Sequence, residues 1–388
     1  MKSYKLITIL LLFLATMFTG CSNDPSDDKP KEKRVADKTI IVFMPFTGAG
    51  GNSLYSHFIQ NINDMEYAIR QRGGLGNNRV IVLIAPNENL SHLISLSPKG
   101  KSNDRDTLRT FYTPDYLSVE GRARLLDIIR QEAPSNVWSM IISSHGEGWL
   151  PPQKAAKRVA TRWFGGATST HKMAVTDLAE SVQRAGMKMQ YMLFDACYMS
   201  CVEVAYDLRE TTDWLIASTS EVMGYGMPYN SILPILLNEN PDYGTLVSSF
   251  VSFYNSYSMP YGTIGVTDCR QMEQMADVMR DINATHSLQD TDGIQDLDAD
   301  HAVKTVYFDF GDYVRHLCAD DTPAYEEFDK VMSQLVPFKG CTPFIYSNAN
   351  RKVLKVEHFS GLAVSDPSVN SAVVELKKET AWWKRTHE

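Results

Sequence analysis

The segment YMLFDACYMSCVEVAYDL, residues 191–208, decides how the fold is interpreted. Its first six residues are mostly apolar without alternation, a pattern typical of a strand covered on both faces. From Met199 to Arg209 the apolar residues take helical spacing. Cys197 lies between the two patterns. The segment therefore predicts a strand that ends at a cysteine and is followed by a helix.

A second segment has the same construction. The apolar run VWSMIIS, residues 137–143, leads into SSHGEGW, residues 143–149, and presents His145 at its end. A cysteine nucleophile needs a neighbouring imidazole, because an unperturbed thiol of pKa ~8.5 is only slightly ionised at neutral pH. If the two strands are neighbours, ~4.8 Å apart in one sheet, His145 and Cys197 come within reach of each other. The two segments predict a thiol hydrolase.

Further apolar runs and helical patterns alternate along the chain. Strands are predicted at 39–44, 79–85, 214–219 and 263–268, and helices at 52–72, 120–132, 174–185, 244–257 and 272–285. Alternation of strand and helix is typical of an α/β fold with a mostly parallel sheet. Ligands of such folds bind outside the carboxyl ends of the strands, where both segments place their reactive residues.

Composition narrows the class of partner. The chain has 388 residues, 44% of them hydrophobic, and a formal net charge of -8. Such a hydrophobic share is ordinary for a globular protein. The acidic balance and the lack of a basic stripe argue against nucleic-acid binding. We expect proteins, peptides or small molecules as partners.

The N-terminal region has the pattern of a bacterial lipoprotein. Two lysines precede an apolar run, and Gly20 directly precedes Cys21. We expect residues 1–20 to be a lipoprotein signal peptide, Cys21 to be lipidated, and 21–36 to be a flexible tether. An ordinary secretory signal or a short anchor is the alternative. The expected location is the bacterial cell envelope, lipid-anchored to a membrane, and either periplasmic or surface-exposed.

The remaining cysteines and the acidic residues give no metal site. The spacing of the cysteines shows no CxxC pair, so neither a disulfide framework nor a zinc site is expected. The acidic loop QDTDGIQDLDAD, residues 289–300, resembles a calcium loop through Asp290, Asp292 and Gly293, but lacks the closing glutamate. We expect a solvated loop and no cofactor, with calcium as the weaker alternative.

The two segments, followed by IASTSEVMGYGMPY at 216–229, resemble the clostripain family of cysteine peptidases, relatives of caspases and gingipains. The resemblance implies a caspase-like three-layer α/β/α sandwich over residues 37–270, with a mostly parallel central sheet. Residues 271–388 would form a C-terminal α+β extension that completes the domain or packs on it. The resemblance also implies a dyad of His145 and Cys197, cleavage after Arg or Lys, and activation by internal cleavage.

Elementary chemistry agrees with this dyad. His145 would take the thiol proton and later protonate the departing amine, while the amides of Gly146 and Cys197 would stabilise the oxyanion. A helix starting just after Cys197 would add a favourable dipole. Asp195 matches the family's basic-pocket aspartate and would pair with the cation of the substrate; its alternative role is a cap on the following helix. Glu203 and Glu221 receive no catalytic role.

The segment LPPQKAAKRVATRW, residues 150–163, separates the two catalytic segments. Prolines, alanines and basic residues are typical of an exposed loop. The resemblance makes it an activation site, cut after Lys154 or Arg158; a solvated basic loop is the alternative. The protein as a whole is predicted to be an endopeptidase. A non-catalytic peptide-binding surface lipoprotein on the same scaffold is the alternative function.

Overall fold

The computed structural model describes residues 33–149, 164–298, 304–319, 321–347, 351–371 and 373–388. Val35–Glu388 forms one compact unit. The predicted signal peptide, Cys21, most of the tether, and the cleavage positions Lys154 and Arg158 lie outside the described residues.

A nine-stranded sheet runs through the unit in the order β13-β11-β10-β9-β5-β1-β2-β3-β4. Its central strands β2, β1, β5, β9 and β10 run parallel, and the strands at both edges run antiparallel. The bounds are β1 Ala36–Met44, β2 Arg79–Asn87, β3 Leu90–Ser95, β4 Asp106–Tyr112, β5 Ser135–Ser143, β9 Met189–Asp195, β10 Thr212–Ala217, β11 Thr263–Asp268 and β13 Phe338–Cys341. The predicted α/β fold with a mostly parallel sheet is confirmed.

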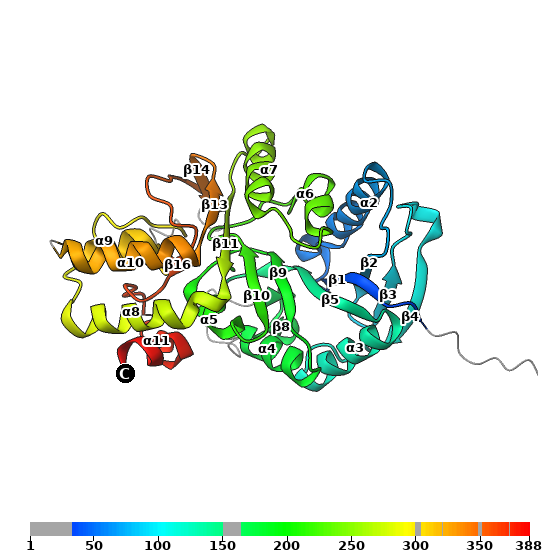
Figure 1. Cartoon of the computed structure of the whole chain (residues 1–388), viewed down its shortest axis with the longest axis horizontal. Helices are drawn as coiled ribbons and strands as arrows, with labels where there is room; N and C mark the ends of the chain where they lie inside the picture. The colour runs from blue at the N-terminus through cyan, green and yellow to red at the C-terminus, as the bar shows by residue number, and fades with distance from the viewer. Residues whose placement is uncertain (1–32, 150–163, 299–303, 320, 348–350, 372) are drawn as a thin grey trace, which may run out of the picture. The chain divides into compact units, whose positions relative to one another are not determined.

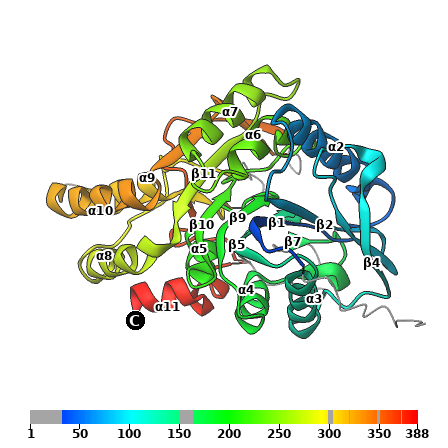
Figure 2. The same cartoon turned by 45° about the vertical axis from the view of Figure 1, so that its right-hand side comes forward.

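Helices cover both faces of the sheet (Figure 1). One face carries α2 Tyr55–Gln71, α6 Tyr229–Leu236 and α7 Tyr243–Ser256. The other carries α3 Val119–Glu132, α4 Val175–Arg184 and α5 Val202–Leu208, as Figure 2 shows from a second side. The apolar side chains of each layer form their own buried cluster against the sheet. Two cores separated by one sheet make the molecule a three-layer sandwich.

The C-terminal part packs on the same body. It consists of α8 Met272–Thr285, β12 Phe308–Asp309, α9 Phe310–Cys318, α10 Thr322–Leu335, β14 Phe344–Ser347, β15 Lys352–Lys355, β16 Ala363–Val364 and α11 Ala381–His387. Strand β13 from this part forms an edge of the main sheet. The aromatic tail docks on the body, because Trp382 of α11 is fully buried.

The sequence patterns missed some elements and misplaced others. Strands β3 and β4 were not predicted, because their residues are only partly buried and lack a continuous apolar run. The predicted helix 52–72 begins only at Tyr55, after a short 3-10 turn at Gly50–Asn52. The predicted helix 199–209 begins only at Val202. Both N-terminal boundaries were therefore three residues too early.

Candidate active site

The two segments meet at the carboxyl edge of the sheet. Strands β5 and β9 are parallel neighbours, and Ser143 at the end of β5 is in register with Asp195 at the end of β9. The backbone N–H of Ser144 donates to the carbonyl of Asp195 at 3.2 Å. This pairing carries the chains that follow, with His145 and Cys197, out of the sheet side by side, as the sequence predicted.

His145 begins the two-residue strand β6, His145–Gly146, which pairs with β7 Phe164–Gly165. Its Nε2 lies 2.9 Å from the carbonyl oxygen of Asn52. A carbonyl only accepts hydrogen bonds, so this contact places a proton on Nε2. The contact ties the imidazole ring to the segment that leads into α2.

Gly146 is close to the backbone of the nucleophile. A methyl group at this position would lie 2.8 Å from Cβ of Ala196 and 2.9 Å from the carbonyl oxygen of Cys197. It would also lie 3.3 Å from the amide nitrogen of Cys197. Only glycine allows this approach. The residues of both predicted oxyanion amides are therefore neighbours.

The sulfur of Cys197 lies against the loop that follows β10. The N–H of Val222 donates to Sγ at 3.3 Å, and Sγ donates to the carbonyl of Val222 at 3.9 Å. Burial raises the pKa of this thiol to about 12, and the nearby carboxylate of Glu221 raises it further. Without a cationic partner the thiol stays protonated at neutral pH.

The prediction that a helix starts just after Cys197 and stabilises its sulfur through the helix dipole is wrong. Helix α5 starts at Val202, with Cys201 as its N-cap, so a turn separates the nucleophile from the helix. Tyr198, in that turn, has a positive φ of 60°. Dipole effects fall off within the first turn of a helix, so α5 gives the sulfur little stabilisation.

Asp195 is 7% exposed and held by hydroxyl groups. The hydroxyls of Tyr229 and Ser143 donate to its Oδ2 at 2.9 Å and 3.3 Å. Burial raises the pKa of the carboxyl to about 6, while the hydrogen bonds from Tyr229, the backbone of Met227 and Ser143 oppose the rise. Asp195 caps no helix, since α5 starts seven residues later. The carboxylate is ionised at neutral pH.

A glycine keeps the Asp195 carboxylate accessible. Gly226 has a φ of 77°, and a methyl group there would lie 2.7 Å from Oδ2 and 2.8 Å from Oδ1 of Asp195. The hydroxyl of Tyr254 donates to the carbonyl of Gly226 at 2.8 Å and fixes this part of the loop.

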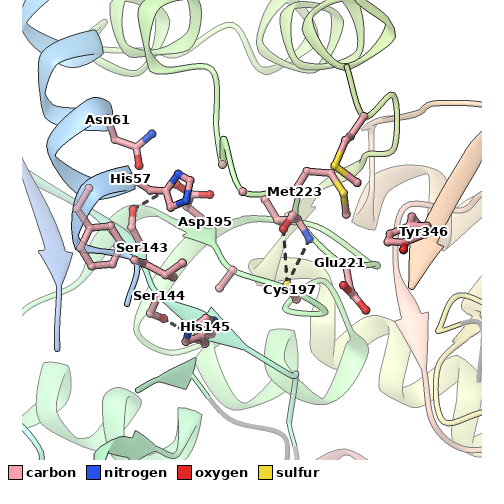
Figure 3. A pocket seen from close by; sticks show the side chains of 17 residues that line it. His57, Asn61, Ser143, Ser144, His145, Asp195, Cys197, Glu221, Met223 and Tyr346 are labelled. Carbon is pink, nitrogen blue, oxygen red and sulfur yellow. Dashed lines mark hydrogen bonds between the residues drawn. The ribbon is translucent and has the colours of Figure 1, made fainter. Parts of the chain in front are cut away.

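These side chains share one cavity of about 350 Å³, shown in Figure 3. His145, Asp195 and Cys197 all line it, together with Glu221. Helix α2 contributes His57, Phe58 and Asn61, and the C-terminal part contributes Tyr346. A hydrogen-bonded carboxylate, a thiol and an imidazole in one cavity are the groups that thiol hydrolysis of a cationic substrate needs.

Three contributions to the site were missed by the sequence patterns. The carbonyl of Asn52 is a backbone group, and no residue type signals it. Gly226 and Tyr229 lie in the segment 216–229 that carried the family resemblance, but their contact with Asp195 depends on the fold. The small size of Gly226 and the hydroxyl group of Tyr229 were the only signals that the sequence offered for these two residues.

Nothing in the described part of the chain forms a metal site of three or more His, Cys, Asp or Glu side chains. Among the described helices, none has the length and apolar composition of a membrane span. Of the cysteines that the structure describes, all five are free thiols.

Comparison with known proteins places the chain and its fold in one family. Residues 47–336 match the model of the clostripain family, Peptidase_C11. A search of curated proteins gave no match. A secreted C11 cysteine protease from Bacteroides thetaiotaomicron, "iotapain", is 37% identical, with a TM-score of 0.84 over 91% of this chain and 100% of its own.

Two further solved structures are similar. A clostripain from Bacteroides thetaiotaomicron in complex with the peptide inhibitor BTN-VLTK-AOMK is 43% identical over 58% of this chain and 99% of its own, with a TM-score of 0.55. An inactive zymogen C11 protease from Parabacteroides distasonis shares the fold at 23% identity, with a TM-score of 0.77 over 92% of this chain and 100% of its own. The chain therefore belongs to the clostripain family and is a cysteine-type peptidase.

Proposed function

We propose that the protein is an endopeptidase that cleaves after Arg or Lys, with Cys197 as nucleophile and His145 as base. The proton of Sγ moves to Nδ1 of His145, and the sulfur attacks the scissile carbonyl. The imidazolium then protonates the departing amine, and water hydrolyses the resulting thioester. The high pKa of the thiol supports this order, because the thiolate needs the imidazolium beside it.

The amides of Gly146 and Cys197 are the proposed donors to the tetrahedral oxyanion. The close approach at Gly146 supports this assignment, because it brings the two backbones within van der Waals distance. Two preorganised N–H donors stabilise the charge that develops on the carbonyl oxygen.

The carboxylate of Asp195 carries the proposed specificity. It is ionised, buried and directed to the cavity beside Cys197. A guanidinium or ammonium group would replace the lost solvation, whereas an apolar side chain would leave the charge unpaired. The inhibitor bound to the 43% identical clostripain has a peptide that ends in lysine, which agrees with this choice.

Activation and location complete the proposal. Cleavage after Lys154 or Arg158 would fit the enzyme's own specificity, and both residues lie outside the described part of the chain. Lipidation at Cys21 would hold the enzyme at the cell envelope, and the described residues would stand clear of the membrane. The 37% identical relative is described as secreted, which is consistent with export. Neither a cofactor nor calcium takes part in the proposed chemistry.

A peptide panel that varies only the residue before the cut tests the specificity. Wild type should cleave Arg and Lys peptides and leave norleucine or Glu peptides intact. The isosteric variant Asp195→Asn should lower kcat/KM for the Arg peptide on the order of a hundredfold, because a charge-assisted hydrogen bond is lost. Full activity of Asp195→Asn on the Arg peptide would contradict the role of Asp195; Cys197→Ala controls for contaminating proteases.

A further inference from the structure

A hairpin from the C-terminal part reaches the catalytic cavity. Strands β14 and β15 pair antiparallel, and Tyr346 of β14 lines the same cavity as Cys197. Met259, on the loop between α7 and β11, lines it as well. Met259 is 38% exposed, so its side chain is accessible at the cavity. The proposed chemistry uses neither residue.

The hairpin presents an apolar face beside this cavity. In β14, Ile345 and Ser347 are buried, so Phe344 and Tyr346 point to the opposite side. Val353 of β15 lies directly across from Tyr346 and shares its face. Phe344 is 44% and Val353 49% exposed. Exposed apolar residues continuous with a catalytic cavity indicate a surface that binds substrate.

The ring of Tyr346 is fixed in place. It stacks on Tyr261 with ring centroids 5.4 Å apart and an interplanar angle of 22°. Two hydrogen bonds tie the start of the hairpin to the loop before β11: the N–H of Thr342 donates to the carbonyl of Gly262, and the N–H of Gly262 donates to the side-chain Oγ1 of Thr342, each at 2.9 Å. Because the ring is already held in place, binding a substrate side chain against it costs little conformational entropy.

The position of Tyr346 relative to the reacting groups says which substrate residue it meets. Figure 3 shows Asp195 and His145 on one side of Cys197 and Tyr346 on the other. The leaving amine must lie at His145, so Tyr346 faces the part of the substrate that precedes the cut. Neighbouring side chains of an extended peptide point in opposite directions. When the basic side chain reaches Asp195, the preceding side chain points away from it.

We propose that Tyr346 and Met259 form the subsite for the residue immediately before the basic residue, and that this subsite selects an apolar or aromatic side chain. The proposal rests on the proposed function, which places the basic side chain at Asp195. It assigns a specificity role to the C-terminal part of the chain, outside the strands that carry the catalytic residues.

Glu221 adds a second preference to this subsite. Its carboxylate lies between Cys197 and Tyr346 in Figure 3 and lines the same cavity. The hydroxyl of Tyr198 donates to it at 3.5 Å. A negative charge on this wall repels an acidic side chain. An acidic residue before the basic residue should therefore be the poorest choice.

The test compares peptides with a fixed Arg before the cut and Phe, Leu, Gly or Asp in the preceding position. For wild type, kcat/KM should be about tenfold higher with Phe than with Gly, since about 1.4 kcal/mol of apolar burial gives a factor of ten. Tyr346→Ala should reduce the Phe-to-Gly ratio to near one, and Tyr346→Phe should keep it. Tyr112→Ala is the matched control, because Tyr112 is 79% exposed on β4 at the other edge of the sheet.

Binding separates this inference from the proposed function. The same labelled peptides are titrated against Cys197→Ala and against Cys197→Ala with Tyr346→Ala, and fluorescence anisotropy is measured. A preference for Phe that Tyr346→Ala removes supports the subsite even if Arg and Lys peptides are not cleaved. The proposal would be overturned if wild type gave equal kcat/KM values for the Phe and Gly peptides. It would also be overturned if Tyr346→Ala lowered kcat/KM by the same factor for every peptide. Absence of both binding and cleavage would overturn it too.

Discussion

The carboxyl edge of the sheet and the interface between α5 and the C-terminal part each bury one carboxyl group from the same segment. Asp195 at the sheet edge receives two hydroxyl hydrogen bonds and faces the cavity. Glu203 in α5 receives a hydrogen bond at 2.9 Å from the N–H of Ser365. Its other oxygen is buried and has no hydrogen-bond partner in the described part of the chain.

A neighbouring carboxyl group, beside burial, separates the two acids in charge. Burial raises the pKa of Glu203 to about 8, and the nearby Asp366 carboxylate raises it further. Burial raises the pKa of Asp195 only to about 6, and the hydrogen bonds from Tyr229, the backbone of Met227 and Ser143 oppose the rise. At neutral pH the acid at the site is ionised and the acid at the interface is neutral. Donors aimed at a carboxylate keep it available for a cationic ligand.

The largest expected effect is the difference in activity between alanine variants of Cys197 and Cys201, the two cysteines of the segment 191–208. Cys197→Ala should lower kcat at least ten-thousandfold, a typical loss when a nucleophile is removed, and the purified chain should remain intact between 150 and 163. Cys201→Ala, which changes a fully buried thiol, should keep the activity and the internal cleavage after Lys154 or Arg158. Peptide hydrolysis and N-terminal sequencing measure both.

Cleavage of the Cys197→Ala chain at these positions would show that another protease activates the protein. An intact, fully active wild type would contradict activation by cleavage. Thermal unfolding of both variants checks that each is folded.

The sequence predicted the strands that carry the chemistry because both faces of each strand are covered. Continuous apolar runs mark β1, β2, β5, β9 and β10 without reference to the rest of the chain. Strand β3 and the edge strand β4 escaped prediction, because β3 is only partly buried and β4 is mostly exposed, so neither needs a continuous apolar run. The antiparallel direction of β11 depends on the chain path and leaves no mark in its residues.

The candidate site was predictable in its residue types and not in its electrostatics. His145, Cys197 and Asp195 stand at strand ends, where the fold class places reactive groups. The charge state of Asp195 depends on Ser143 and Tyr229, which are 52 and 34 residues away. The charge state of Glu203 depends on Ser365 and Asp366 in the C-terminal part. Such distances along the chain leave no local pattern.

The pH dependence of the free energy of unfolding tests whether Glu203, unlike Asp195, is neutral in the folded protein. Its folded pKa of about 8 lies above the ordinary value of 4.5, so its neutral form favours folding. This contribution is complete below about pH 4.5 and is lost as pH rises through about 8. Wild type should lose on the order of 3 kcal/mol of unfolding free energy between pH 5 and 8 from this group.

Urea unfolding of wild type and Glu203→Gln at pH 5, 6.5 and 8 measures that loss. The glutamine resembles the neutral acid, so the variant should show a flatter pH dependence than wild type. Parallel curves for the two proteins would mean that Glu203 is ionised in the fold.

The smaller effect concerns ligand binding at Asp195. A cationic side chain binds the ionised carboxylate, and protonation below its pKa of about 6 removes the partner. Affinity for an Arg peptide, measured on Cys197→Ala, should fall about tenfold between pH 7 and 5, because the ionised fraction of a group with a pKa of about 6 falls about tenfold over this range. A norleucine peptide should bind weakly at both values. Cys197→Ala with Asp195→Asn should bind the Arg peptide weakly and without this pH dependence. A tenfold fall that persists in the double variant would assign the titration to a group other than Asp195. The contrast between Asp195 and Glu203 would then fail, because neither carboxyl group would act as the charged ligand of the substrate.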